Sequence, residues 1–123
     1  MTNHSIINLK SPFPFAETVQ RLVQVFATKG IKVFATIDQQ AEAQSVGLDM
    51  PPTTLIIFGN PRAGTPLMLA NPVSGVDLPL KVLIHEDKEK SIMVSFTSAQ
   101  ELIKRYSLPE ELTSNLIPAE RLI

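Results

Sequence analysis

The feature that most restricts the fold is an apolar run at positions 53–58, read TTLIIF. It lies between Pro51-Pro52 and Gly59, residues that interrupt regular structure. Apolar side chains at successive positions point to both faces of a sheet, as in a strand that is buried on both sides. The run therefore predicts an interior strand, and the rest of the chain has to supply its neighbours and its cover.

Two further strands are predicted at residues 80–84 and 91–96, because both segments are rich in side chains that suit a pleated surface. The charged residues 86–90 join them, which predicts a hairpin with its turn in solvent. Residues 5–9 and 31–37 are interpreted as two more strands. A hairpin among interleaved helices favours an α+β class, a small antiparallel or mixed sheet covered by helices.

An amphipathic helix is predicted from Phe15, because apolar residues at positions 15, 19, 22, 23 and 26 fall on one helical stripe. Asp38 can act as the N-cap of a second, short helix. Ser98 with Glu101 three residues later has the spacing of a capping box, which predicts another helix. Pro109 suits the first turn of a last one.

Composition limits the classes of function. The 123 residues fit one domain, 1–123, and their 11 Lys and Arg are scattered along a chain of net charge −1. No basic stripe exists, so nucleic acid is not predicted as a partner. The chain has no cysteine, which excludes disulfides and thiolate metal sites. No secretory signal or apolar span is visible, so we expect a cytoplasmic protein with no membrane partner.

The segment 59–79 is crowded with proline, glycine and asparagine. Asn60-Pro61 and Thr65-Pro66 each have the pattern of an N-cap followed by proline at the first helical position. We expect the helix to begin at Thr65, because a start at Asn60 would place Pro66 inside the helix at a cost of about 3 kcal/mol.

Either start is predicted to leave helix N-terminal amides free, with glycines allowing close approach and Arg62 supplying a permanent positive charge. These are the components of an anion site, and its candidate residues are Asn60, Arg62, Gly64, Thr65 and Asp77. The structural alternative is that Arg62 pairs with Asp77 and that turn chemistry alone explains the loop.

Two other groups of residues suggest alternatives. His85, Glu86 and Asp87 end a predicted strand, and His85 with either carboxylate could act as an acid/base pair in an enzyme. The only other histidine is His4, so no metal site or cofactor is predicted. Apolar residues near the C-terminus could be buried on another chain or on the domain's own core; they are Leu116, Ile117, Leu122 and Ile123.

The string PPTTLIIFGNPRAGTPLMLANPVSGVDLPLKVLIHED, residues 51–87, resembles the domain of unknown function 302 family, whose members carry similar PPT, FGNP, GTPLM and DLPLK segments. The resemblance implies helices packed on one curved, mainly antiparallel sheet, as in the TATA-binding-protein fold, and it implies homodimers. It implies no chemistry. An Asp-His pair is common in the family after the second strand, whereas here Asp38 is followed by Gln39.

The leading hypothesis is thus a small homodimeric module that binds an anionic or polar small molecule at the 60–66 loop. The alternatives are an enzyme using His85 with Asp87 or Glu86, and a structural or partner-binding protein.

Overall fold

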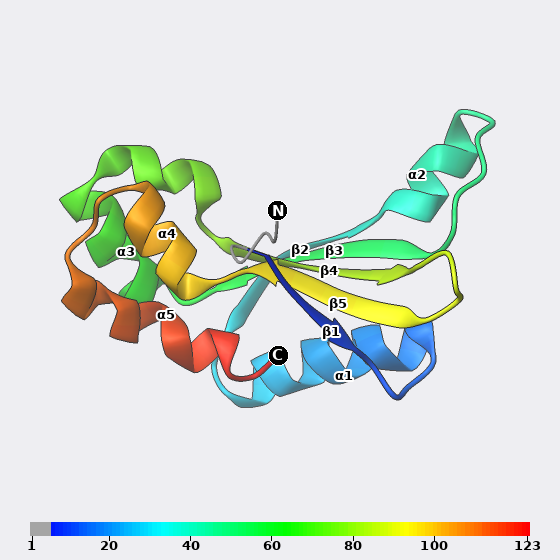
Figure 1. The fold of residues 1–123 in the computed structure, drawn as a ribbon, viewed down its shortest axis with the longest axis horizontal. Helices are drawn as coiled ribbons and strands as arrows, with labels where there is room; N and C mark the ends of the chain where they lie inside the picture. The colour runs from blue at the N-terminus through cyan, green and yellow to red at the C-terminus, as the bar shows by residue number, and fades with distance from the viewer. Residues whose placement is uncertain (1–5) are drawn as a thin grey trace.

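The computed structural model describes residues 6–123 and contains one five-stranded sheet with helices around it (Figure 1). The strands are β1 Ile6–Lys10, β2 Lys32–Asp38, β3 Thr53–Gly59, β4 Leu80–Glu86 and β5 Ile92–Thr97. Their spatial order is β1-β5-β4-β3-β2, and every neighbouring pair is antiparallel. The predicted α+β class and the predicted β4–β5 hairpin are confirmed. Ser5, where the first strand was expected to begin, and His4 lie outside the described residues.

The helices gather mainly on one side and at one end of the sheet (Figure 1). In chain order they are α1 Phe15–Thr28, α2 Gln39–Ser45, α3 Pro61–Ala70, the 3-10 turn η1 Pro72–Asp77, α4 Ala99–Arg105, the 3-10 turn η2 Glu110–Leu112 and α5 Thr113–Glu120. In Figure 1, α1 runs below the sheet, whereas α3, α4 and α5 cluster at its left end. The short helix α2 projects from the opposite end, on the other side from α1.

The main core forms between α1 and the inner face of the sheet. The predicted stripe of α1 buries Leu22 and Phe26, and the ring of Phe26 stacks on that of Phe58 with centroids 4.3 Å apart. Val82 and Ile84 of β4 are fully buried beside them. Aromatic rings of this size contribute much of a core's apolar contact, so this pair anchors the helix to the sheet.

Strand β3 is interior, as predicted, because it pairs with β2 on one side and β4 on the other. It is not buried on both faces, however. Its residues Ile56 and Phe58 are buried under α1, whereas Leu55 and Ile57 on the opposite face are partly exposed. We therefore correct the double burial inferred from the apolar run.

A second core holds the cluster of helices at the end of the sheet. It centres on Leu67 of α3, which is only 1% exposed and packs with Leu102 and Ile103 of α4 and Leu116 of α5. The other apolar C-terminal residues, Ile117, Leu122 and Ile123, also pack on the described chain's own cores.

Helix α3 begins five residues earlier than the sequence predicted. Pro61 is its first residue, Asn60 is the N-cap, and Pro66 lies inside the helix. A proline there removes one backbone hydrogen bond. The earlier start instead satisfies the first amides through Asn60 and places Leu67 on the buried side, and these contacts outweigh the lost bond. The caps predicted at Asp38 and Ser98 are confirmed, since their side chains accept from the Ala41 and Glu101 amides.

Candidate functional site

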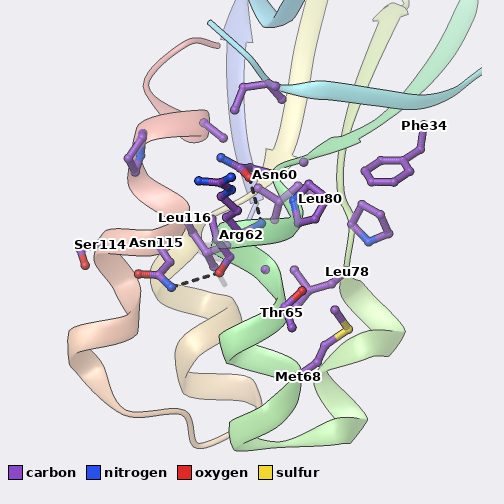
Figure 2. Close-up of a pocket in the computed structure, with 18 residues that line it drawn as sticks. Phe34, Asn60, Arg62, Thr65, Met68, Leu78, Leu80, Ser114, Asn115 and Leu116 are labelled. Carbon is purple, nitrogen blue, oxygen red and sulfur yellow. Dashed lines mark hydrogen bonds between the residues drawn. The ribbon is translucent and has the colours of Figure 1, made fainter.

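A cavity of about 510 Å³ opens between α3, α5 and the end of the sheet where β3 leaves it (Figure 2). One wall is the first turn of α3, and the opposite wall is α5. The floor is apolar and comes from Phe34, Leu78, Pro79, Leu80 and Leu116. Its polar lining residues are Asn60, Arg62, Thr65, Ser114 and Asn115. An apolar cavity of this volume with a few polar groups is typical of a small-molecule site.

The cavity is electrostatically one-sided. Among the described residues, 6–123, Arg62 is the single charged residue in its lining, and no carboxylate of this range lines it. Within residues 6–123, the four recorded ion pairs do not include Arg62. Figure 2 shows its side chain beside Asn60 at the N-terminal end of α3. The cavity therefore offers a planar positive charge with several donors, which suits a carboxylate or phosphate group.

The amides at the start of α3 are not free, contrary to the sequence-based expectation. Pro61 has no amide hydrogen, and the Arg62 amide donates to Asn60 Oδ1 at 3.0 Å. The Ala63 and Gly64 amides both donate to the Asn60 carbonyl oxygen, at 2.9 and 2.8 Å. Asn60 thus occupies the donors that would have formed a helix N-terminal anion site, and the Arg62 side chain remains as the cation of the cavity.

Asp77 takes no part in the cavity lining, and its expected pairing with Arg62 is wrong. Its carboxylate accepts instead from Arg105 Nη1 at 2.9 Å and from the Tyr106 hydroxyl. Burial works to raise the pKa of Asp77, but the hydrogen bonds from Tyr106 and Arg105 leave that pKa below its ordinary value of 3.8. Asp77 is therefore a structural tie between η1 and the end of α4.

The two helices that flank the cavity are joined across it and share an unusual feature. Asn115 Nδ2 of α5 donates to the Ala63 carbonyl oxygen of α3 at 3.1 Å. Each helix also contains an internal proline, Pro66 in α3 and Pro118 in α5. Proline has no amide hydrogen, so the carbonyls four residues earlier, those of Arg62 and Ser114, lose their usual helical donor. Both belong to residues that line the cavity.

Gly64 is a position of open space. A Cβ atom placed there would have no other atom within 4 Å, and its φ lies outside the left-handed region. The backbone does not require glycine at this position, so the missing side chain serves to leave the cavity open.

His85 and Asp87 are not brought together. His85 Nε2 contacts Ser95 Oγ at 3.0 Å on the outer face of the sheet, and Ser95 Oγ donates to Asn8 Oδ1. Asp87 Oδ1 accepts the Glu89 and Ser91 amides within the hairpin turn. His85 lines neither of the two larger cavities of the described chain. Residues 6–123 contain no cluster of three or more potential metal ligands.

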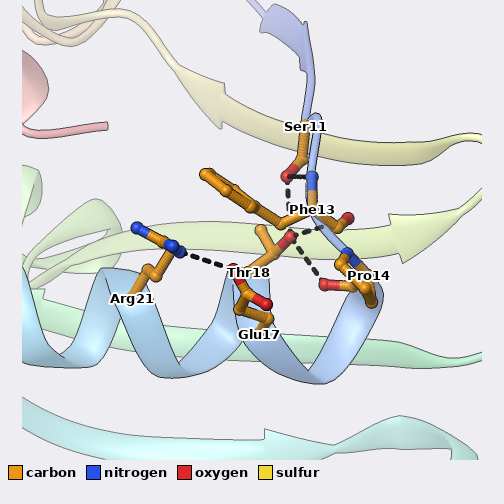
Figure 3. A network of polar contacts seen from close by, with 6 residues as sticks. All are labelled: Ser11, Phe13, Pro14, Glu17, Thr18 and Arg21. Atoms are coloured by element: carbon orange, nitrogen blue, oxygen red, sulfur yellow. Dashed lines mark hydrogen bonds and ion pairs between the residues drawn. The ribbon is translucent and has the colours of Figure 1, made fainter.

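A second cavity, about 470 Å³, lies beside the start of α1. Figure 3 shows the polar contacts there, which involve the lining residues Ser11, Thr18 and Arg21. Two charged residues line this cavity, Lys10 and Arg21. Arg21 lies 3.8 Å from the Phe13 ring centroid and pairs with Glu17 at 2.8 Å. The cavity's hydroxyls are also satisfied, since Ser11 Oγ and Thr18 Oγ1 are 2.7 Å apart. Lys10 forms none of the ion pairs recorded for residues 6–123, but Arg21 and both hydroxyls already have partners, so this cavity is the weaker candidate.

Comparison with known proteins identifies a family that this chain matches. Residues 7–121 match the family described as Domain of unknown function DUF302. The chain belongs to this family. A DUF302 protein from Bacillus stearothermophilus, described as an uncharacterized conserved protein, has the same fold in its crystal structure. The TM-score is 0.82 at 17% identity, over 98% of this chain and 93% of that one, and at this identity the likeness concerns the fold alone.

Longer relatives carry a DUF302-like segment. The chain is 37% identical over 103 residues to Fluoride-specific ion channel FluC 1 of Brucella suis biovar 1 (strain 1330), which covers 84% of this chain and 41% of that protein. Fluoride-specific ion channel FluC 1 of Brucella abortus biovar 1 (strain 9-941) matches at the same identity, with 38% of its length covered. The chain thus spans about two fifths of these relatives. Among residues 6–123, no helix has the length and apolar character needed to cross a bilayer.

Sequence reasoning found one wall of the cavity and missed the others. Asn60, Arg62, Gly64 and Thr65 all line it. The missed residues come from other segments of the chain: Ile31 and Phe34 around the start of β2, Leu78 to Leu80 at the start of β4, and five residues of α5, namely Ser114, Asn115, Leu116, Pro118 and Ala119. Pro118 inside a helical pattern was the available signal, because an internal proline often has a reason beyond helix formation.

Proposed function

We propose that this protein is a binding module for a small molecule that has an apolar body and an anionic group. The observation that carries the proposal is the combination of an apolar cavity with one unpaired cation, Arg62, and no carboxylate in its lining. The apolar body would contact Leu78, Leu80 and Leu116, and the anionic group would bind the Arg62 guanidinium. This narrows the sequence-based hypothesis, since the occupied amides of α3 leave no site for a small inorganic anion on the backbone.

A thermal-shift and calorimetry series tests this proposal. Carboxylates of increasing apolar size should raise the melting temperature, and the matching alcohols should do so far less. Arg62→Ala should weaken carboxylate binding by roughly ten- to a hundredfold, the range expected for a charged hydrogen bond. The unliganded melting temperature should stay unchanged, because Arg62 is exposed.

Arg121→Ala is the matched control, since it removes an exposed arginine that does not line the cavity. Equal binding by the two variants would contradict the proposed role of Arg62, and unfolding of Arg62→Ala would show that the residue is part of the scaffold.

We also propose that the protein forms a homodimer through the outer face of its sheet. The side chains of Ile37, Leu55, Ile57, Leu83 and Met93 share this face and are only partly covered. In Figure 1, no helix of the described chain runs along its middle. Light scattering after size exclusion should show a dimer that becomes a monomer on Leu83→Glu. Leu69→Glu, at an exposed site on α3, should leave the dimer intact.

The Brucella relatives support a second candidate role, as an accessory unit of a membrane transport protein. In those proteins, the matching segment is about two fifths of a chain named as a fluoride-specific ion channel. The matching segment here has no helix that could cross a bilayer, so the named channel activity would reside in the remainder. Replacing the matching segment of the Brucella suis protein with this chain should preserve fluoride resistance in cells. Loss of resistance equal to that of a deletion would refute interchangeability.

A further inference from the structure

The segment from α3 to η1 carries a concentrated apolar surface. Met68, Leu69, Val73 and Val76 are 36%, 79%, 61% and 73% exposed. They are four of the eight large apolar residues that are exposed in the described chain, and they lie within nine consecutive positions. Residues 63–76 contain no charged side chain. We call these four residues the apolar tip.

The tip is held rigidly, so its exposure is not a sign of poor packing. Beneath it, Leu67 and Ser74 are each 1% exposed. Asn71 accepts the Val73 amide and donates through Nδ2 to the Tyr106 carbonyl oxygen at 2.9 Å. At the other end of η1, Asp77 is bonded to Arg105 and Tyr106. The fold therefore fixes the backbone while it directs four apolar side chains outward.

The tip is continuous with the cavity. Met68 belongs to both, because it is exposed on the tip and also lines the cavity. Figure 2 shows it further along α3 than Arg62, with Leu78 and Thr65 between. A molecule in the cavity could thus extend from the Arg62 guanidinium toward the surface formed by the tip.

The charges next to the tip are mainly positive. The end of α4, with Lys104 and Arg105, lies against η1 through the bonds to Asn71 and Asp77. Residues 60–81 and 99–105 together contain four Lys and Arg but only two carboxylates, Asp77 and Glu101. Arg105 pairs with both carboxylates. The positive excess is confined to the part formed by α3, η1, the start of β4 and α4, because η2 and α5 at the same end add Glu110, Glu111 and Glu120 but only Arg121 as a nearby cation.

We propose that the apolar tip docks on an anionic lipid bilayer and that the cavity binds a single-chain carboxylate amphiphile taken from it. This inference rests on the proposed function, whose ligand class it specifies. Exposed apolar side chains next to cations are the combination that binds the interface of an anionic membrane. The carboxylate would bind Arg62, and the alkyl chain would lie along α3 toward Met68. The expectation of no membrane partner rested on the lack of a secretory signal and of an apolar span in the sequence, and the exposed apolar tip is a separate feature.

The test uses two probes, decanoate in solution and vesicles of phosphatidylcholine with phosphatidylglycerol. Wild-type protein should bind decanoate by calorimetry and sediment with the vesicles. The tip variant Leu69→Ser/Val76→Ser should lose vesicle binding by at least about tenfold while its affinity for decanoate stays the same. Arg62→Ala should lose decanoate binding by at least about tenfold and weaken vesicle binding much less, because it removes only one of the four cations and leaves the apolar tip intact. Val46→Ser/Leu48→Ser removes two exposed apolar residues elsewhere and should change neither measurement.

The possible failures are distinguishable. If wild-type protein binds decanoate but not vesicles, the bilayer inference is wrong and the proposed function stands. If short aromatic carboxylates bind and decanoate does not, the ligand class inferred here is wrong. If the tip variant loses self-association instead of vesicle binding, the tip is an interface between copies of the chain, which overturns the inference. If no carboxylate binds at all, the proposed function itself fails.

Discussion

Replacing Gly64 by alanine should make the protein more stable. Glycine inside a helix is destabilising by about 0.5–1 kcal/mol relative to alanine, because it loses more backbone freedom on folding. Gly64 is the fourth residue of α3, its φ is outside the left-handed region, and a Cβ atom there meets no neighbour within 4 Å. No clash offsets the gain. For a domain of this length, we expect the melting temperature to rise by roughly 2–4 °C.

The measurement is thermal and urea unfolding of the wild type and Gly64→Ala, with Gly30→Ala as the matched control. Gly30 follows α1 with φ at +73°. An alanine there must adopt the left-handed conformation, at a cost of about 1–2 kcal/mol. The same chemical change should therefore have opposite signs at the two sites. A Gly64→Ala protein less stable than wild type would refute both the open space and the position of Gly64 inside α3.

Three other predictions concern the contacts that shape the site. Asn60→Ala should lower the free energy of unfolding by about 1 kcal/mol, because the N-cap of α3 is lost; a urea titration measures it. Asp77→Asn should make the melting temperature depend less on pH in the acid range. The folded-state pKa of Asp77 is lowered, so its stabilisation is present above its ordinary pKa and is lost as the pH falls through the lower folded value; melting temperatures between pH 7 and about 2 should reveal this, and parallel curves would contradict it. Phe58→Ala should cost about 3–5 kcal/mol in urea unfolding, because it removes the ring that stacks on Phe26.

Local patterns in the sequence were sufficient for much of the fold. The stripe from Phe15 to Phe26 predicted α1, and the side chains of Asp38 and Ser98 predicted two helix starts. Each of these signals depends only on residues within one or two helical turns, so tertiary packing does not override it. The predicted start of α3 was wrong because only the energetic penalty of Pro66 inside the helix was considered. The burial of Leu67 in a core shared with α4 and α5 depends on residues of those helices at least 32 positions away, which no local pattern contains.

The candidate site was predictable only on the wall built from consecutive residues. Arg62 and Thr65 stood out because turn-forming residues crowd that loop. Asp77 was expected to pair with Arg62 of the same loop, whereas its actual partners, Arg105 and Tyr106, lie 28 and 29 positions later. Pairings between distant segments are set by packing of the second core, so the choice of ion-pair partner could not be derived from spacing.

The internal prolines of α3 and α5 affect how the site would respond to mutagenesis. Pro66 and Pro118 remove the usual helical donor, four residues on, from the main-chain oxygens of Arg62 and Ser114, and a main-chain oxygen is present whatever side chain the residue bears. An alanine scan of the lining would therefore leave both acceptors in place. If the ligand selectivity of the cavity persists through such a scan but disappears when the two prolines are replaced, then main-chain acceptors and not side chains determine it.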